Sequence, residues 1–371
     1  MIFSPSRNNP LKETFKHGFR YSDCWVDDAR LVVLTAVSAA KLGARLLTHT
    51  TCQTLNRYQN HWQATLSHAS NAEFTLHAKM LINATGPWVD HTAKHVLKIE
   101  NNHHLQKIKG SHLVVPKFYA GDHAYILQHT DQRIVFVLPF AHDTTLIGTT
   151  DIPFEGDPHD AHLSREEATY LCTVVNHYFK QPLTPSDALW QFSGVRALVA
   201  KRGKSATALS RDYVLEINAS SGAPLLTIFG GKITTHRQLA SHTLDKIKAF
   251  FPHLKANWTA TVPLPGGDLQ GLTFMAFLKQ CHTRYPFLTE KMTYRLARAY
   301  GSRIDLIVGN ATTLAKLGTC FGAELYAAEV DYLLNHEWAT CAKDILWRRT
   351  KLGLLFKPEQ VLGLEQYIMH R

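Results

Sequence analysis

One stretch, Pro224 to Phe250, constrains the fold of this chain most, because it changes from strand to helix across a pair of glycines. Leu225–Phe229 is a short apolar run of strand type, and Gly230 and Gly231 remove the side chains where it ends. From His236 onward, apolar residues recur at steps of three and four, which is typical of one helix face. These positions are Leu239, Ala240, Thr243, Leu244, Ile247 and Phe250. The sequence therefore predicts a strand, a glycine turn and a helix.

This unit has the features of an anion-binding corner. The start of a helix carries about half a positive charge and unpaired N–H groups. The glycines allow a ligand to approach the backbone, and Lys232 adds a full charge. Thr234 and Thr235 are each able to cap the helix. A tight turn with no ligand explains the same residues equally well, so this unit alone leaves both interpretations open.

Composition limits the classes of protein to which the chain can belong. Its 371 residues, 45% apolar and 19% charged, are typical of a soluble enzyme of two or three domains. An excess of 40 Lys and Arg over 30 Asp and Glu gives a formal charge of +10, which favours anionic partners. The sequence has no basic–aromatic ladder, so nucleic acid is not expected. Six scattered cysteines without a CxxC pair predict neither a metal site nor a disulfide framework.

The first hundred residues indicate part of a nucleotide-binding fold. A helix is expected after Asp27 and Asp28, ending at Gly43, and a parallel strand follows at Ala44 to Leu55. A hairpin then turns at Ser70 and Asn71, and Lys79 to Ala84 is predicted to be a strand buried on both faces. This order matches the later half of a dinucleotide-binding domain, although the sequence contains no GxGxxG segment.

An antiparallel sheet and a helical domain are expected in the rest of the chain. The predicted strands are Lys109 to Pro116, Ala124 to Gln128, Arg133 to Phe140, Thr144 to Asp151 and Ala188 to Val195. A helix from Ser164 to Phe179 should begin with a capping box, because Glu167 stands three residues after Ser164. After the Pro/Gly linker Thr261 to Asp268, the predicted helices are Leu272 to Arg284, Thr289 to Tyr300, Ile304 to Gly309, Phe321 to Glu337, Cys341 to Thr350 and Pro358 to Met369.

Three basic residues are candidates for an anion clamp. Arg196 is expected at the end of a strand, Arg211 follows fifteen residues later, and Lys232 lies in the glycine corner. Arginine binds phosphate or carboxylate through two parallel hydrogen bonds. His112 is a candidate for proton transfer, although a lone histidine is more often a structural residue. Taken singly, each arginine is more often a surface residue, and Glu166 and Glu167 are best explained as first-turn helix residues.

Several segments together resemble the bacterial FAD-dependent glycerol-3-phosphate dehydrogenases. They are YSDCWVDDARLV (Tyr21 to Val32), NATGPWV (Asn83 to Val89), IKGSHLVVP (Ile108 to Pro116), IVFVLPF (Ile134 to Phe140), IGTTD (Ile147 to Asp151), SGVRAL (Ser193 to Leu198), FGGKITTHR (Phe229 to Arg237), RYPFLTE (Arg284 to Glu290) and HEWATCAKDILWRRTK (His336 to Lys351). They occur in the family's order along essentially the whole chain.

The resemblance implies a fold of class α/β plus α+β. Residues 1–107 would be a partial FAD-binding domain of the glutathione-reductase type and D-amino-acid-oxidase class, with a lead-in from the substrate domain. Residues 108–195 would form the antiparallel substrate-binding sheet. Residues 196–260 would return to the FAD domain and carry the flavin and substrate site. Residues 261–371 would be the all-helical C-terminal domain.

The resemblance also implies a reaction and its partners. Enzymes of this family oxidise sn-glycerol 3-phosphate to dihydroxyacetone phosphate by hydride transfer to FAD. They then pass the electrons to quinone as peripheral proteins on the inner face of the cytoplasmic membrane. An anionic membrane surface would therefore be a partner, and a homodimer is compatible with the resemblance.

Site residues follow from the matched segments. Thr85 and Gly86 would line the FAD, and Gly230, Gly231, Lys232, Ile233 and Thr234 would run along the isoalloxazine. Arg196 would lie beside the flavin and the reacting carbon and stabilise the developing oxyanion, since arginine stays charged. Arg211, with Lys232 and Thr234, would bind the substrate phosphate. His112 and Lys232 would handle the proton.

The sequence departs from the family at its start. The GxGxxG unit and a further GGxRY segment are missing, so we expect a C-terminal fragment of a split or truncated enzyme, with a separate N-terminal fragment as partner. Such a fragment should have an exposed sheet edge and weak FAD binding. Two alternatives remain at this point. One is a related FAD oxidase or dehydrogenase whose substrate lacks a phosphate, and the other is a non-catalytic remnant.

Overall fold

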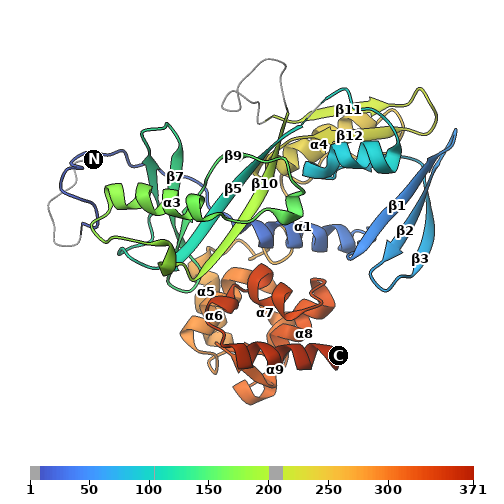
Figure 1. The fold of residues 1–371 in the computed structure, drawn as a ribbon. Coiled ribbons are helices and arrows are strands. Elements are labelled where there is room, and N and C mark those ends of the chain that lie inside the picture. Colours follow the sequence, from blue (N-terminus) through green and yellow to red (C-terminus); the bar gives the residue numbers. More distant parts are fainter. Residues whose placement is uncertain (1–8, 104, 200–211) are drawn as a thin grey trace. The chain divides into compact units, whose positions relative to one another are not determined.

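The computed structural model describes residues 9–103, 105–199 and 212–371, and the chain divides into two compact units (Figure 1). The sheet unit comprises Met1–Tyr21 and His49–Asn257, and the helical unit comprises Ser22–Thr48 and Trp258–Arg371. The inclusion of Ser22–Thr48 in the helical unit was not anticipated from the sequence. The four-part functional division proposed from the sequence stays a prediction.

The sheet unit contains a six-stranded sheet, and this sheet is antiparallel, as predicted. Its order is β10-β5-β8-β7-β6, and β9 also pairs with β5. The strands are β5 Leu105–Pro116, β6 Tyr125–Gln128, β7 Ile134–Phe140, β8 Thr144–Gly148, β9 Ile152–Pro153 and β10 Trp190–Val199. The sequence placed the end of the last strand too early, because β10 continues through Arg196 to Val199.

Helix α3, Arg165–Tyr178, covers one face of this sheet. The helix begins with the predicted capping box, in which Ser164 and Glu167 bond each other's backbone N–H groups. The apolar side of the helix packs against alternate residues of the strands, and together they form one core. Members of this core include Leu113, Val115, Val135, Val137, Ile147, Leu171 and Val175. Because side chains alternate across a strand, the intervening residues of β5 lie on the opposite face.

A second, three-stranded sheet contains the glycine corner. Its strands are β11 Val214–Asn218, β12 Leu225–Phe229 and β4 Leu81–Asn83, and β12 pairs with β4 in parallel. Helix α4, His236–Ile247, follows β12, and the short helix α2, Val89–His91, follows β4. Two predictions were wrong here. Ile82 in β4 is 43% exposed rather than buried, and α4 ends before Phe250, which is 37% exposed.

The segment from Thr50 to Ala78 forms an antiparallel ribbon of β1 Thr50–Arg57, β2 Trp62–His68 and β3 Glu73–Ala78. The hairpin at Ser70 and Asn71 is confirmed. The parallel strand from Ala44 to Leu55 was wrong, since the strand starts at Thr50 and pairs with β2 in the antiparallel sense. Its polar, half-exposed sequence suits a ribbon rather than a buried parallel strand.

The helical unit contains helix α1, Asp28–Lys41, as predicted from its acidic start. The other helices are α5 Phe274–Arg284, α6 Glu290–Tyr300, α7 Ile304–Val308, α8 Ala327–His336, the π-helix Asp344–Arg349 and α9 Pro358–Met369. The predicted helix Phe321 to Glu337 begins only at Ala327. A two-stranded ribbon, β13 Cys320–Gly322 and β14 Leu325–Tyr326, precedes it. Among the described residues, none of the helices has the length and apolarity needed to cross a bilayer.

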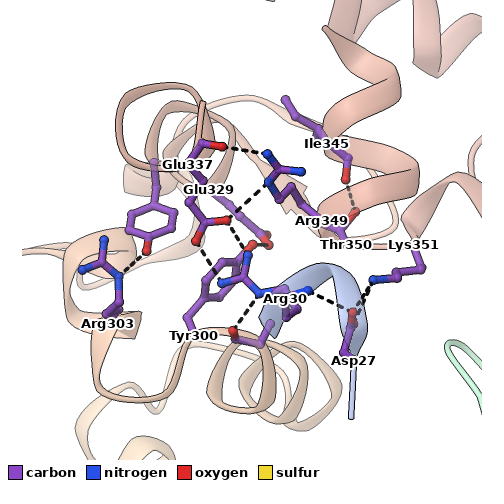
Figure 2. A network of polar contacts seen from close by, with 12 residues as sticks. Asp27, Arg30, Tyr300, Arg303, Glu329, Glu337, Ile345, Arg349, Thr350 and Lys351 are labelled. Carbon is purple, nitrogen blue, oxygen red and sulfur yellow. Dashed lines mark hydrogen bonds and ion pairs between the residues drawn. The ribbon is translucent and has the colours of Figure 1, made fainter. Parts of the chain in front are cut away.

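A buried network of charges joins the start of α1 to the rest of the helical unit (Figure 2). The Arg30 guanidinium forms two hydrogen bonds with the fully buried carboxylate of Glu337, one of them 2.9 Å long. Lys351 Nζ lies 2.8 Å from an oxygen of Asp27, the residue that caps α1. Burial alone lowers the pKa of Arg30, but the hydrogen bond and charge of Glu337 raise it above the usual arginine value. These contacts hold α1 to the C-terminal helices.

Candidate functional site

Two parallel strands bring the predicted cofactor-binding segments to one edge of the second sheet. In the pairing of β4 with β12, Leu81 lies beside Leu225 and Asn83 beside Thr227. Both strands end at the same edge, because they run in the same direction. Thr85 and Gly86 leave β4 there, and the Gly230–Thr234 segment leaves β12. The carboxyl ends of parallel strands are where ligands bind in open α/β sheets.

The backbone at this edge has conformations that require glycine. Gly230 and Gly231 have φ angles of +73° and +101°. A Cβ atom on Gly230 would lie 3.1 Å from Val199 Cγ2, and one on Gly231 would lie 2.9 Å from Leu239 Cδ1. Gly86 also has a positive φ, +56°, but a Cβ there would meet nothing within 4 Å. The first two glycines are therefore needed for close packing, whereas the Gly86 backbone faces open space.

A positively charged helix start follows the glycine pair. Lys232 is exposed and precedes a 3₁₀ turn, Ile233–Thr235, which leads directly into α4. Ile233 and Thr234 are also exposed. In the described part of the chain, the Thr235 hydroxyl bonds the Lys232 carbonyl at 3.1 Å and gives α4 no side-chain cap, contrary to the capping role considered for it. Lys232 lines a cavity of about 300 Å³ with Asp212, Tyr213, Thr235 and Gln238.

The face of the six-stranded sheet opposite α3 carries His112 and Arg196. In the pairing of β5 with β10, His112 lies beside Phe192, Gly110 beside Gly194, and Ile108 beside Arg196. These pairs are two residues apart, so their side chains project from the same face. His112 and Arg196 are four steps apart along the paired strands, which corresponds to about 13 Å between their backbones.

Packing fixes the ring of His112. It stacks on Phe192 with ring centroids 4.9 Å apart and an interplanar angle of 13°. It also lies over Gly148, where a side chain would collide with the imidazole. A glycine on one neighbouring strand and an aromatic ring on the other therefore hold the histidine on the sheet surface.

Arg196 reaches across its own sheet rather than away from it. Its Nη1 forms an ion pair with Asp151, in the segment between β8 and β9. Its Nη2 lies 3.3 Å from the position that a Cβ atom on Gly110 would occupy. Gly110 is two residues from His112, about 7 Å along β5. The guanidinium therefore extends over Gly110 toward His112.

The glycine corner packs against the end of β10 within the sheet unit. A Cβ on Gly230 would lie 3.5 Å from the Ala197 carbonyl oxygen, and Ala197 follows Arg196 in β10. Val199 and Phe229 share a small buried cluster with Val89, from the helix that follows Gly86. The structure thus places Thr85, Gly86 and the Gly230–Thr234 segment beside the end of β10, the strand that carries Arg196, with His112 farther along the sheet. Arg211 lies outside the described residues.

Sequence reasoning missed Asp151 as a partner of Arg196. An acidic residue at the end of the predicted strand Thr144 to Asp151 marked Asp151 as a possible site residue, but nothing in the sequence indicated its partner. The role given to Glu167 was confirmed, since it belongs to the capping box of α3. Within the described ranges, no group of three or more His, Cys, Asp or Glu side chains is arranged to hold a metal ion.

Comparisons with known proteins agree on one family. The model of the family described as FAD dependent oxidoreductase matches residues 2–237. A second family model, the C-terminal domain of alpha-glycerophosphate oxidase, matches residues 257–366. The glycerol-3-phosphate dehydrogenase of Pseudomonas aeruginosa is 45% identical over 97% of this chain and 70% of its own length. The aerobic glycerol-3-phosphate dehydrogenase of Escherichia coli is 41% identical over 98% of this chain and 72% of its own length.

A third relative and a solved structure extend this picture. The D-erythritol 1-phosphate dehydrogenase of Brucella abortus is 41% identical over 92% of this chain and 68% of its own length. The crystal structure of the glycerol-3-phosphate dehydrogenase from Bacillus halodurans, complexed with FAD, superposes with a TM-score of 0.77 at 25% identity. That superposition covers 92% of this chain and 67% of the other. The chain therefore belongs to the family of FAD-dependent glycerol-3-phosphate dehydrogenases.

Proposed function

We propose that this chain oxidises the secondary alcohol of sn-glycerol 3-phosphate to the ketone of dihydroxyacetone phosphate. The support is the family together with one observation: the guanidinium of Arg196 extends over Gly110 toward His112. A cation and a proton acceptor on one sheet face suit an alcohol that loses a proton from oxygen while its carbon loses a hydride.

The residues at the corner fit FAD. The backbone at Gly86 faces open space, and Gly230 and Gly231, whose positive φ angles favour glycine, leave no side chain just before the 3₁₀ turn. Thr85, Gly86 and the Gly230–Thr234 segment would hold the cofactor. When bound, FAD supplies the acceptor for the hydride. Lys232 and the helix start place positive charge beside it.

The proposal assigns a task to each remaining residue, and Lys232 has more than one. His112 accepts the hydroxyl proton, and its ring is fixed by Phe192 and Gly148. Arg196 stabilises the negative charge that develops on the alcohol oxygen. Lys232 is a second candidate for handling the proton. The phosphate is bound by Arg211 with Lys232 and Thr234, which orients the reacting carbon.

The proposal includes a quinone as the final electron acceptor and a peripheral location on the inner face of the cytoplasmic membrane. The formal charge of +10 is compatible with an anionic bilayer surface. Cosedimentation with anionic lipid vesicles, reversed by salt, tests the membrane contact. Reduction of a soluble quinone by the substrate-reduced enzyme tests the acceptor, and size-exclusion chromatography with light scattering tests a homodimer.

A longer polyol phosphate is the second candidate substrate, because the Brucella abortus relative is a D-erythritol 1-phosphate dehydrogenase at 41% identity. Anaerobic mixing of the flavin-loaded chain with each alcohol separates the candidates. We expect glycerol 3-phosphate to bleach the flavin faster than erythritol phosphate does, and glycerol itself to be nearly inert. Equal bleaching by glycerol and glycerol 3-phosphate would contradict the assignment of a phosphate site.

The experiment is run on the chain alone and on the chain co-expressed with a fragment that carries a GxGxxG strand–turn–helix unit. Flavin bound only in the second sample supports a separate N-terminal fragment as partner. If neither sample binds flavin or reacts, the proposal fails and the chain is non-catalytic.

A further inference from the structure

Asp151 lies at a point where three strands meet. It immediately precedes β9, in which Ile152 pairs with Lys109 and Pro153 with Ile108. On the other side of β5, Ile108 pairs with Arg196. Strand β5 therefore separates the backbone of Asp151 from that of Arg196, and an ion pair between them has to cross it.

Gly110 allows this crossing. Its Cα carries no side chain on the face that holds Arg196, and a Cβ there would collide with Thr149 Oγ1 and lie 3.3 Å from Arg196 Nη2. Gly194, the cross-strand neighbour of Gly110, is also without a side chain, and a Cβ there would meet nothing within 4 Å. The guanidinium thus lies above a pair of glycines, with Asp151 on one side and open space above Gly194.

The backbone next to Asp151 is held from the face of the sheet that α3 covers. Thr150 is fully buried, and its hydroxyl donates to Glu167 Oε1 at 2.8 Å while accepting from the N–H of Ser111 at 3.0 Å. The Glu167 carboxylate also accepts hydrogen bonds from Ser111 Oγ and the Ser164 N–H, both at 2.8 Å, and pairs with Lys109 Nζ at 2.8 Å. The position of Asp151 is thereby tied to the first turn of α3.

We infer that Asp151 is a positioning residue for Arg196. It binds Nη1 and so fixes the orientation in which Nη2 and Nε remain available to the substrate oxygen. This inference rests on the proposed function. An unrestrained arginine has many rotamers, and the side chains of Arg196 and Asp151 are each 42% exposed, so the ion pair itself adds little to stability. Its value lies in orientation, because small displacements of a catalytic group have large effects on rate.

The test compares Asp151→Ala and Asp151→Asn with the wild-type chain. Asp131→Ala is the matched control, because Asp131 also pairs with an arginine, Arg133, at a partly exposed position of the sheet unit. In flavin-loaded protein, Asp151→Ala should lower the limiting rate of flavin reduction by glycerol 3-phosphate about 10- to 100-fold. The half-saturating substrate concentration should change less than about threefold, since the phosphate is held elsewhere. Asp151→Asn should recover to within about fivefold of wild type, because its amide oxygen still accepts from Nη1.

A second readout needs neither flavin nor substrate. The ¹⁵N–¹H signal of Arg196 Nε, identified by its loss in Arg196→Lys, should be resolved in the wild type and in Asp131→Ala. In Asp151→Ala it should shift to the position of mobile surface arginines. An unchanged Arg196 signal in Asp151→Ala would overturn the inference, and so would an unchanged limiting rate. If the wild type does not react with glycerol 3-phosphate, the proposed function fails, and the Arg196 signal alone decides whether Asp151 positions the guanidinium.

Discussion

At the scale of single residues, the proposed chemistry depends on Arg196 and His112, and side chains from neighbouring segments hold both in place. Arg196 could be named because an arginine beside small residues in SGVRAL suits anion binding. Its partner Asp151 could not be predicted, since the ion pair crosses a strand between segments 45 residues apart. The same holds for His112, whose ring is fixed by Phe192 and Gly148 on two different strands.

Replacing Arg196 tests its electrostatic role. Arg196→Lys keeps one positive charge but removes the planar group that can bond Asp151 and the substrate together. We expect the limiting rate of flavin reduction to fall about 100- to 1,000-fold, as for loss of one oxyanion donor. Stopped-flow absorbance measures this rate, with Arg133→Lys as the control that should react normally. A rate within a few-fold of wild type would remove Arg196 from the chemistry.

Replacing Gly230 tests whether the glycine corner binds FAD. In Gly230→Ala the residue has to adopt a φ of +73°, and its Cβ lies 3.1 Å from Val199. Strain of this kind costs about 1–3 kcal/mol, so FAD affinity should fall about tenfold or more. Fluorescence titration with FAD measures the affinity. Gly363→Ala, in α9 with open space around it, should leave FAD affinity unchanged and stabilise the helix by about 1 kcal/mol. Equal FAD affinity in both variants would contradict the assignment of the corner.

At the scale of elements, features set by neighbouring residues were predicted correctly, whereas the pairing of strands was not. Helix α3 was predicted correctly because its capping box is contained in four consecutive residues. The β2–β3 hairpin was predicted because its turn, Ser70 and Asn71, is also contained in consecutive residues. Strand β1 was assigned to a parallel sheet because sequence does not reveal which strand pairs with which. The ribbon before α8 was missed because its turn depends on the positive φ angles of Ala323 and Glu324, which the sequence does not signal.

The buried carboxylate of Glu167 should make stability depend on pH. Burial raises its pKa, but hydrogen bonds from Lys109, the Ser164 backbone, Ser111 and Thr150 lower it, so the net pKa is below the ordinary 4.5. A depressed folded-state pKa stabilises the fold above the unfolded pKa, and this stabilisation is lost as pH falls through the folded pKa.

Urea unfolding of the sheet unit between about pH 6 and about pH 3 measures this contribution. Glu167→Gln should be less stable than wild type by about 1–3 kcal/mol near neutral pH, and the difference should shrink on acidification. Glu166→Gln changes the exposed neighbour in the same helix turn and should behave much more like wild type. A difference between Glu167→Gln and wild type that does not vary with pH would contradict this account.

At the scale of the whole molecule, the helical unit is assembled from two distant parts of the sequence. Gly and Pro residues that separate the predicted helices allowed its C-terminal part to be predicted. Nothing in Ser22–Thr48 indicated that α1 belongs with these helices. The buried pair of Arg30 with Glu337 accounts for this association (Figure 2). Complementary charges 307 residues apart in the chain give no local signal.

Removing one member of that pair should destabilise the helical unit specifically. Arg30→Met leaves the Glu337 carboxylate buried without its main partner, which should cost about 3 kcal/mol or more. Hydrogen exchange read by mass spectrometry should show faster exchange in α6, α8 and the π-helix Asp344–Arg349, with β5 and β10 unchanged. The control Arg284→Met breaks an exposed pair with Asp305 and should cost less than about 1 kcal/mol. Equal effects of the two variants would show that the buried pair has no special role.

We propose that the glycine corner and the Arg196 face of the sheet form one site for flavin and a phosphorylated alcohol. A crystal structure of the chain with FAD and dihydroxyacetone phosphate tests it most directly. We predict the isoalloxazine beside the backbone of Gly230 and Gly231, with the ketone oxygen within hydrogen-bonding distance of Arg196. A flavin bound away from the glycine corner, or a ketone oxygen with no contact to Arg196, would contradict the claim.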